Sequence, residues 1–233
     1  MEKSFALEDQ ALVKFRAIPE MAELSDEDLR AFMRLGRFER HLKGAQILSQ
    51  NHPDSAMHIL LSGRVKMYLS APDGKELVLS YLSAPTHFGE LSPIDSGAHS
   101  VNVVAVDDAE LFSVESGNLA EAIQINPTLA LALVASLSRS LREAITLLED
   151  MAFRDATHRV MRVILNIATA CCEAKGFPAV EGFTHHEISL LAGTSRETAS
   201  RVISSLAKDE VVATKGRKIV VDIVKLRERL ERG

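Results

Sequence analysis

The sequence contains only two cysteines, Cys171 and Cys172, which are adjacent to each other. Structural zinc sites and iron–sulfur clusters use cysteines that are spaced along the chain, often as C-x-x-C pairs, and this sequence has no such pair. The two residues lie in an apolar stretch. We therefore interpret them as small core residues of a protein in a reducing compartment, not as metal ligands.

Long apolar runs and catalytic motifs are missing as well. No window holds 18 uncharged apolar residues, and residues 1–9 are acidic and lack the apolar run of a secretory signal. We therefore expect a cytoplasmic protein with no membrane partner. The G-x-S-x-G, P-loop, H-E-x-x-H and dinucleotide-binding motifs are all absent. We expect no enzymatic activity, no catalytic residues and no metal site.

The charge is distributed unevenly along the chain. The whole chain carries a net charge of −5, but residues 153–233 hold 14 Lys and Arg against 10 Asp and Glu, a net charge of +4. The remaining residues are therefore net −9. This asymmetry favours contact between the C-terminal part and a polyanion.

A β-rich texture begins near Phe38 and continues to Val114. Short apolar runs alternate there with turn signals such as Ser62-Gly63 and Pro72-Asp73-Gly74. Several short strands at this spacing predict an all-β roll or barrel. The predicted strands are 57–61, 65–69, 77–82, 101–106 and 111–114.

Helical signals flank this region. Ser25, followed by three acidic residues, predicts a helix that runs to Leu35, and a short helix is expected over 116–124. Asn126-Pro127 begins a long apolar-periodic stretch that continues to about Met151. Its seam residues alternate spacings of three and four, which favours a two-fold dimer helix over a helix packed only on its own roll. They are Val134, Leu137, Leu141, Ala144, Leu148 and Met151.

The C-terminal part predicts a helix-turn-helix. We expect a hinge at 153–155, a helix over 157–173 and a break at Gly176-Phe177-Pro178. Thr184–Glu187 and Thr194–Glu197 are each predicted to be a capping box that begins a helix. Gly193 lies between the two helices, where a tight turn tolerates positive φ.

The second of these helices has two distinct faces. Ala199, Val202, Ile203 and Leu206 recur at helical spacing and are expected to face the core. The opposite side, near the helix N-terminus, would reach base edges in the major groove. Its residues are Ser195, Arg196, Glu197, Ser200 and Arg201. The alternative is a solvated helix with an internal Glu197–Arg201 pair.

A hairpin is predicted after this helix. Its strands are 211–214 and 219–224, and the turn between them is basic. Lys215, Arg217 and Lys218 of this turn are placed to meet DNA phosphates. The preceding pair of helices and this hairpin together indicate a winged helix-turn-helix.

Several segments resemble the CRP/FNR family of bacterial transcription regulators, and the similarity covers nearly the whole chain. They are Asp73–Leu82 in the roll, Phe88–Leu91 in the phosphate-binding cassette, Met151–Asp155 at the hinge, and Ser195–Thr198 with Arg201 in the recognition helix. The resemblance implies an α+β architecture with three parts. These are a cyclic-nucleotide-binding-type β-roll that senses an effector (1–125), a dimerisation helix (126–152) and a winged helix-turn-helix (153–233).

The resemblance also implies partners and base contacts. The expected partners are double-stranded DNA, a second copy of the chain and RNA polymerase. Base contacts would come from Arg196, Glu197 and Arg201, on a two-fold pseudo-palindrome with TGTGA-like or GTG-containing half-sites.

The effector site implied by the resemblance comprises Gly89, Glu90, Leu91, His99 and Ser100. Members that bind cyclic AMP place an Arg where this chain has His99, and a neutral His lacks the charged bidentate fork. They also place Thr-Ser against the adenine where this chain has Ala144-Ile145. Tight binding of cyclic AMP is therefore not expected. Another small effector, weak binding of a cyclic nucleotide, or no effector at all remain alternatives.

The sequence also bears on other sensor types and on one other class of protein. The N-terminal cysteines of an iron–sulfur sensor of the FNR type are absent, whereas a haem sensor stays open because histidines lie in the roll region. They are His41, His52, His58 and His87. The alternative to a transcription regulator is a cyclic-nucleotide-binding regulatory subunit that does not bind specific DNA sequences. The base-reading helix argues against it.

Overall fold

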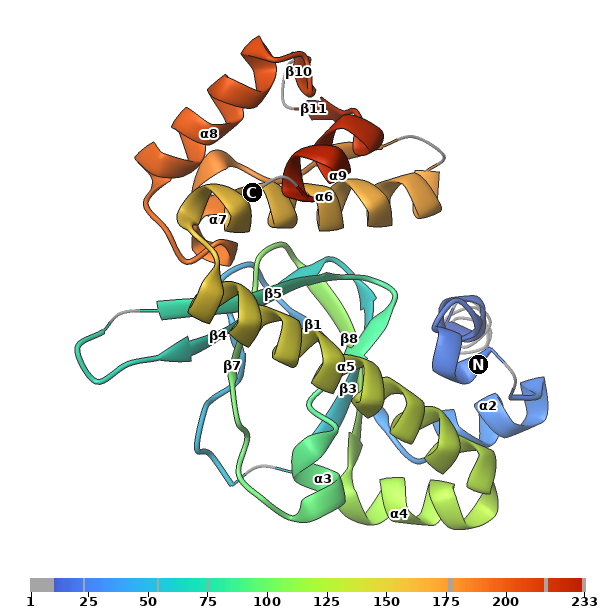
Figure 1. The fold of residues 1–233 in the computed structure, drawn as a ribbon. Helices are drawn as coiled ribbons and strands as arrows, with labels where there is room; N and C mark the ends of the chain where they lie inside the picture. Colours follow the sequence, from blue (N-terminus) through green and yellow to red (C-terminus); the bar gives the residue numbers. More distant parts are fainter. Residues whose placement is uncertain are drawn as a thin grey trace. The chain divides into compact units, whose positions relative to one another are not determined.

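The computed structural model describes residues 11–22, 24–53, 55–74, 76–175, 178–215 and 218–231. The chain forms two compact units, residues 1–141 and residues 142–233. Figure 1 traces the helices and strands of both units along the chain. The predicted mixture of a β-rich N-terminal part, a long helix and a helical C-terminal part is confirmed.

The first unit contains two four-stranded antiparallel sheets. The order in one sheet is β1-β8-β3-β6, with β1 Arg37–His41, β8 Ala109–Glu115, β3 Ala56–Ser62 and β6 Thr86–Phe88. The order in the other is β2-β7-β4-β5, with β2 Gln46–Leu48, β7 Asn102–Ala105, β4 Arg64–Ser70 and β5 Glu76–Ser83. Six of the seven side chains of β3 are buried, so this strand lies at the centre of the roll.

All five predicted strands are present, and three further strands were not predicted. The edge strand β1, RFERH, has four charged or titratable residues out of five, so it lacks apolar alternation. Strands β2 and β6 are three residues long each, which is too short for a periodic signal. These strands are specified by the sheets they join and not by their local sequence.

An aromatic cluster joins the N-terminal helices to the roll. Residues 11–16 are helical, and α2 (Asp26–Met33) follows a 3₁₀ turn, η1 (Pro19–Met21). The rings of Phe15 and Phe32 pack against Phe112 of β8 at centroid distances of 5.4 and 5.7 Å. The predicted N-cap is confirmed as a capping box between Ser25 and Asp28.

A short helix, α3 (Leu91–Asp95), lies between β6 and β7, and two helices follow β8. They are α4 (Ser116–Ile125) and α5 (Pro127–Phe153). Asn126 Oδ1 accepts from the backbone N of Thr128 at 3.0 Å, so α5 begins as predicted, with Pro at its first position. Within the described residues, no single helix has the length and hydropathy needed to cross a membrane; α4 and α5 meet the requirement only together, across a bend of 117°.

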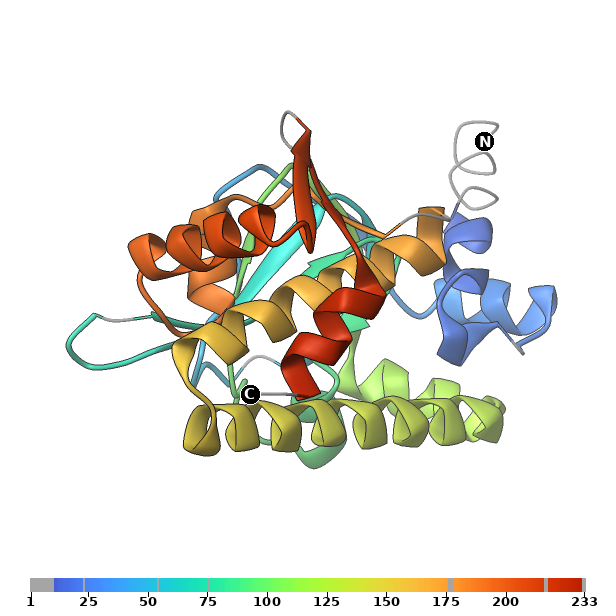
Figure 2. The same cartoon turned by 45° about the horizontal axis from the view of Figure 1, so that its top comes forward.

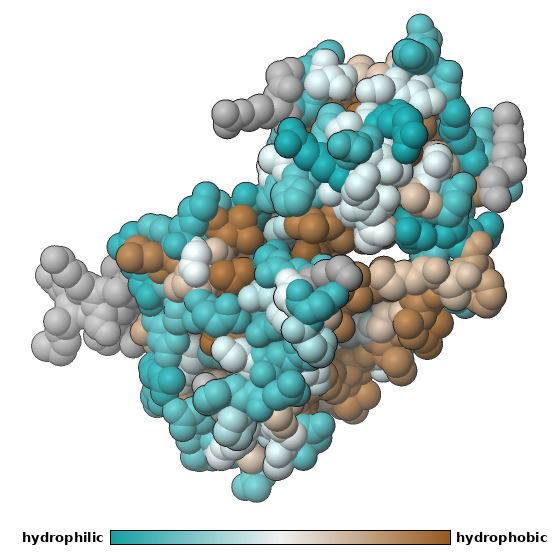
Figure 3. Space-filling model, turned by 90° about the vertical axis from the view of Figure 1, so that its left-hand side faces the viewer, coloured by the Kyte–Doolittle hydropathy of each residue, from teal (hydrophilic) through white to brown (hydrophobic). Residues whose placement is uncertain are grey.

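One side of α5 packs inward and another exposes large apolar side chains. Leu129 and Leu133 are buried in the core of the first unit. In Figure 3, apolar residues gather along α5 at the right-hand edge of the view. The exposed set includes Leu131, Val134, Leu141, Ile145, Leu148 and Phe153. Four predicted seam positions, Val134, Leu141, Leu148 and Met151, belong to the exposed large hydrophobics of the chain.

The second unit is a helical domain with a small sheet. Its helices are α6 (Ala156–Lys175), α7 (His185–Leu191), α8 (Arg196–Lys208) and α9 (Ile223–Glu231). Its strands are β9 (Ala179–Glu181), β10 (Val212–Lys215) and β11 (Lys218–Val221), in the order β10-β11-β9. Figure 2 shows the β10–β11 hairpin next to the C-terminal end of α8.

The predicted wing needs two corrections. A third strand, β9, pairs with β11, so the wing sheet is three-stranded. The prediction that the second wing strand continues to Val224 is wrong, because Asp222 begins a helix: its Oδ1 accepts from the backbone N of Lys225 at 3.0 Å. Gly176 and Phe177 of the predicted break lie outside the described residues.

Candidate functional site

Helix α7 begins with the capping box that the sequence predicts. Thr184 Oγ1 accepts from the backbone N of Glu187 at 3.1 Å, and the Glu187 carboxylate accepts from the backbone N of Thr184 at 2.7 Å. The turn after α7 contains Gly193, whose φ of +56° belongs to the left-handed region that favours glycine. The predicted helix–turn–helix geometry is therefore present.

Helix α8 begins differently from the prediction. Its N-cap is Ser195, whose Oγ accepts from the backbone N of Thr198 at 3.1 Å. The predicted capping box from Thr194 to Glu197 is therefore wrong, since the cap lies one residue later and the residue three positions beyond it is Thr198. As a result, the Glu197 carboxylate does not serve the cap and stays exposed in the first turn.

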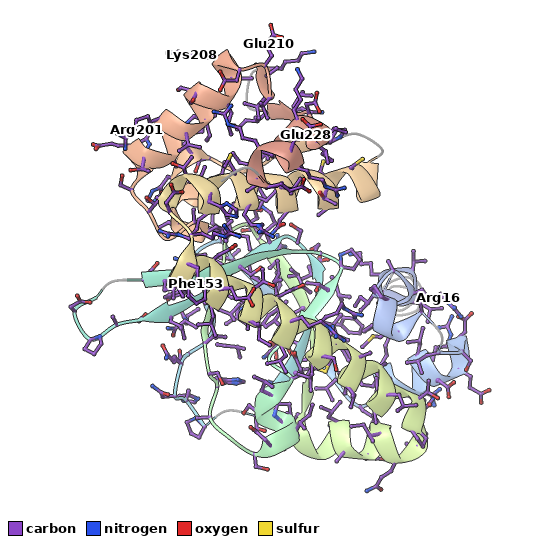
Figure 4. The ribbon with its side chains drawn as sticks, in the orientation of Figure 1. Arg16, Phe153, Arg201, Lys208, Glu210 and Glu228 are labelled. Carbon is purple, nitrogen blue, oxygen red and sulfur yellow. The ribbon has the colours of Figure 1, made fainter. Side chains whose placement is uncertain are left out.

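The two faces of α8 are as predicted. Ala199, Val202, Ile203 and Leu206 are 0–7% exposed and belong to the core of the second unit. Arg196, Glu197 and Arg201 are exposed, and Figure 4 shows Arg201 pointing away from the helix. Among the described residues, Arg201 donates to Thr198 Oγ1 at 3.3 Å and forms no ion pair with Glu197. A helix with its cationic and acidic side chains directed outward can present them to base edges.

Ser200 differs from the other residues proposed for this face. It is half-buried, and its Oγ lies 3.0 Å from Nδ1 of His185, the first residue of α7. The sequence analysis did not foresee this contact, because the two residues are fifteen positions apart and belong to different helices.

An arginine connects the turn between α7 and α8 to the segment before α6. Arg159 donates from Nε to Ala192 O at 2.8 Å and from Nη2 to Gly193 O at 3.2 Å. Its Nη1 donates to Arg154 O at 2.8 Å. One guanidinium therefore ties the hinge to the residues that immediately precede α8. A single Arg within a helix carries no sequence signal for such a role, and the sequence analysis missed it.

The basic residues of the wing have different surroundings. Lys215 is exposed at the end of β10, across the hairpin from Lys218. Lys218 Nζ lies 2.9 Å from Glu181 Oε1 on β9, so its ammonium is already part of an ion pair. Arg217, the third predicted phosphate contact, lies outside the described residues. Lys215 is thus the described wing lysine that is exposed to solvent.

The cassette residues predicted for an effector lie around α3 and the loop after it. Gly89 has a φ of +82°, and a Cβ there would lie 3.1 Å from Ala56 O. Glu90 is half-buried, while Leu91, the first residue of α3, is 48% exposed. His99 is 4% exposed and Ser100 is exposed. A buried imidazole therefore occupies the position at which the family resemblance calls for a charged Arg.

A histidine next to the cassette connects the roll to α5. His87 Nε2 lies 3.1 Å from Ser136 Oγ on α5, within the first unit. Burial lowers the pKa of the His87 ring, and the nearby Glu90 carboxylate opposes that shift. This link between the cassette strand β6 and the long helix was not predicted.

The other histidines of the open haem alternative are engaged or exposed. His58 Nδ1 lies 2.8 Å from Ser113 Oγ, and its ring stacks on Phe88. His41 Nε2 lies 3.2 Å from the Glu39 carboxylate, and His52 is exposed. Within the part of the chain that the structure describes, no group of three or more His, Cys, Asp or Glu is placed to hold a metal ion.

Two family models match the chain in agreement with these two sites. Residues 38–126 match the cyclic nucleotide-binding domain, which covers the roll and the cassette. Residues 158–229 match the Crp-like helix-turn-helix domain, which covers α7, α8 and the wing.

Known proteins are similar over most of the chain. The cyclic AMP receptor protein of Thermus thermophilus is 36% identical over 180 residues, which cover 76% of this chain and 81% of that protein. A CRP-like cAMP-activated global transcriptional regulator of Mycobacterium tuberculosis is 27% identical, over 77% of this chain and 81% of that protein.

Solved structures agree with this similarity. The Thermus thermophilus catabolite activator protein is 31% identical, with a TM-score of 0.55 over 92% of this chain and 99% of that one. A CooA mutant from Carboxydothermus hydrogenoformans shares the fold with a TM-score of 0.75 at 24% identity, over 86% of this chain and 90% of that one. The chain belongs to the CRP/FNR family and is a transcription regulator with a DNA-binding helix-turn-helix domain.

Proposed function

We propose that this regulator binds a two-fold pseudo-palindromic promoter site as a homodimer. Arg196, Glu197 and Arg201 of α8 read base edges in the major groove, and Ser195 and Ser200 lie beside them. Lys215, Arg217 and Lys218 of the wing meet the phosphates. The partners in this proposal are double-stranded DNA and RNA polymerase, and the place of action is the cytoplasm.

The observation that carries the proposal is the outward face of α8. The helix is held by four nearly fully buried apolar residues, while Arg196, Glu197 and Arg201 at its N-terminal end are exposed. Arg pairs with guanine through O6 and N7, and Glu accepts from the amino group of cytosine. This combination suits a G·C-containing half-site such as GTG.

The exposed apolar side chains of α5 support the proposal of a homodimer. Its exposed apolar residues would be covered by the same face of a second copy, which produces the two-fold symmetry of the DNA site. We propose that residues 1–125 sense the effector, residues 126–152 form the dimer helix, and residues 153–233 bind DNA.

Selection from a random DNA library with the full-length chain tests the proposal. The expected product is an inverted repeat whose half-sites contain GTG, with centres one helical turn apart. Enrichment of an asymmetric sequence, or no enrichment at all, would contradict it.

The wing makes its own prediction. Lys215→Ala should weaken binding to all DNA sequences about equally, because phosphates carry no base identity. The magnitude of the slope of log K against log salt should fall by about 0.9 for each lost phosphate contact. A dimer loses one contact per protomer, so the total change should be about two. Fluorescence anisotropy between low and moderate salt measures this slope. Lys208→Ala, at the C-terminal end of α8 (Figure 4), is the matched control and should leave the slope nearly unchanged. A change of sequence preference in Lys215→Ala would contradict the phosphate role.

The cassette predicts weak binding of cyclic AMP. His99 is buried and lacks a guanidinium fork, and Ala144-Ile145 offer no polar side-chain group to an adenine. Each lost charge-assisted hydrogen bond costs about 1.5–3 kcal/mol. Calorimetry should therefore give a Kd weaker than about 1 μM, which corresponds to about 8 kcal/mol of binding free energy. AMP, which has the same base and sugar but an open phosphate, is the control for recognition of the cyclic phosphate. A sub-micromolar Kd for cyclic AMP, but not for AMP, would show that other side chains supply the phosphate contact.

A further inference from the structure

One hydroxyl of the proposed reading face is already engaged by another side chain of the protein. Nδ1 of His185 on α7 lies 3.0 Å from Oγ of Ser200 on α8. Both side chains are half-buried, so the hydroxyl has less rotational freedom than that of an exposed serine. The contact crosses from the first helix of the motif to the second, and its two members are held by helices that pack in one core.

Ser200 is placed where a change in its hydrogen bonding matters for DNA. At 3.6 residues per turn, its direction from the helix axis falls between those of Arg196 and Glu197, one turn further along α8. Both neighbours are exposed and belong to the proposed base-reading set. The hydroxyl therefore lies within the reading face, and its contact with His185 directs it toward α7.

The chemistry of the contact restricts what this hydroxyl offers to DNA. A serine has one proton and two lone pairs, and an imidazole nitrogen is either an acceptor or a donor. If Nδ1 accepts the serine proton, only lone pairs remain for DNA, and these suit the amino groups of cytosine or adenine. If Nδ1 donates, the serine proton is available for guanine O6 or N7, or for thymine O4. An accepting Nδ1 therefore removes the donor role of the serine, whereas a donating Nδ1 occupies one of its two lone pairs and directs the serine proton away from His185.

We propose that His185 is a positioning residue that determines specificity at one base pair of each half-site. It touches no base in this role. It sets, through Ser200, which hydrogen-bonding group α8 presents there. The inference rests on the proposed function, since it requires α8 to be the reading helix. It goes further by assigning sequence discrimination to a residue outside that helix.

Binding-site selection with full-length His185→Leu tests the proposal. Without its partner, Ser200 can both donate and accept, so the base preference at one position of each half-site should fall about fivefold, the value of one neutral hydrogen bond. The other positions should keep their preferences. In His185→Asn the amide replaces Nδ1, and the preference at that position should be restored. His186→Leu, the exposed neighbouring histidine, is the matched control and should keep the wild-type preferences.

A double-mutant cycle establishes that the effect passes through Ser200. Ser200→Ala should lose preference at the same position, and adding His185→Leu to it should change nothing further. Thermal melting shows whether each variant folds, and His185→Gln, with a longer amide that misplaces its polar atoms, replaces the leucine variant if that one does not fold.

Three results would overturn the inference. One is an unchanged preference at every position in folded His185→Leu or His185→Gln. Another is an equal weakening of all sequences, which indicates a phosphate contact. The third is a changed preference that persists in the Ser200→Ala background. Failure of the proposed function is distinct, because wild-type protein would then select no symmetric site at all.

Discussion

Arg201→Ala is expected to lose about 1–3 kcal/mol of DNA-binding free energy at each half-site, and roughly double that at a symmetric site. Arg201 is exposed on α8, and its hydrogen bond to the Thr198 hydroxyl does not neutralise its charge. A guanidinium in the major groove donates to guanine O6 and N7 together, and alanine donates to neither. Both protomers lose the same contact, so the two losses add.

The measurement is fluorescence anisotropy on two DNA duplexes. One carries the selected site, and the other has the guanine opposite Arg201 replaced in both half-sites. Arg201→Ala should bind the first duplex much more weakly than wild type does, and should differ little from wild type on the second. Arg227→Ala is the matched control: it removes the same charge from an exposed position of α9. An equal loss on both duplexes would mean that Arg201 contacts phosphate and not a base.

Leu141→Glu is expected to dissociate the dimer. Leu141 is 63% exposed in the single chain and lies seven residues from both Val134 and Leu148, which are 58% and 66% exposed. In a parallel two-fold helix pair it would meet its own copy. Two buried leucines contribute about 3–6 kcal/mol in total, and two carboxylates facing each other add repulsion. The dissociation constant should therefore rise by roughly two to four powers of ten.

Sedimentation equilibrium at micromolar concentration measures this change. Thr146→Glu is the matched control, since Thr146 is exposed on α5 about half a turn away from the seam. It adds the same charge and should leave the dimer intact. A wild-type chain that sediments as a monomer, or a Leu141→Glu variant as dimeric as wild type, would exclude this face of α5 as the interface.

The sequence predicted those features that depend on local pattern. The five predicted roll strands, the Ser25 and Thr184 caps and the buried face of α8 all follow from periodicity or from side chains within four residues. The N-cap of α8 was misplaced by one residue, because Thr194 and Ser195 are both good caps and only the structure shows which one bonds to the helix.

The features that were missed depend on residues far apart in the chain. Strand β9 exists because it pairs with β11, and its three residues carry no pattern of their own. The contact of His87 with Ser136 spans 49 residues, and that of Arg159 with Ala192 spans 33. Such contacts result from tertiary packing, which cannot be predicted from a short stretch of sequence.

The three hydrogen bonds of Arg159 limit where the helix-turn-helix domain can be cut and fused to another protein. Arg159 donates to the carbonyls of Ala192 and Gly193, and also to that of Arg154, which precedes α6. The hydrogen bonds that hold the helix-turn-helix domain therefore include a backbone group from the connection between α5 and α6. In a chimera joined to a foreign N-terminal part at Asp155 or later, a foreign residue would have to place its carbonyl in this position, whereas a junction before Arg154 keeps the native acceptor. A junction for exchanging the N-terminal part is therefore best placed at or before Phe153, the last residue of α5.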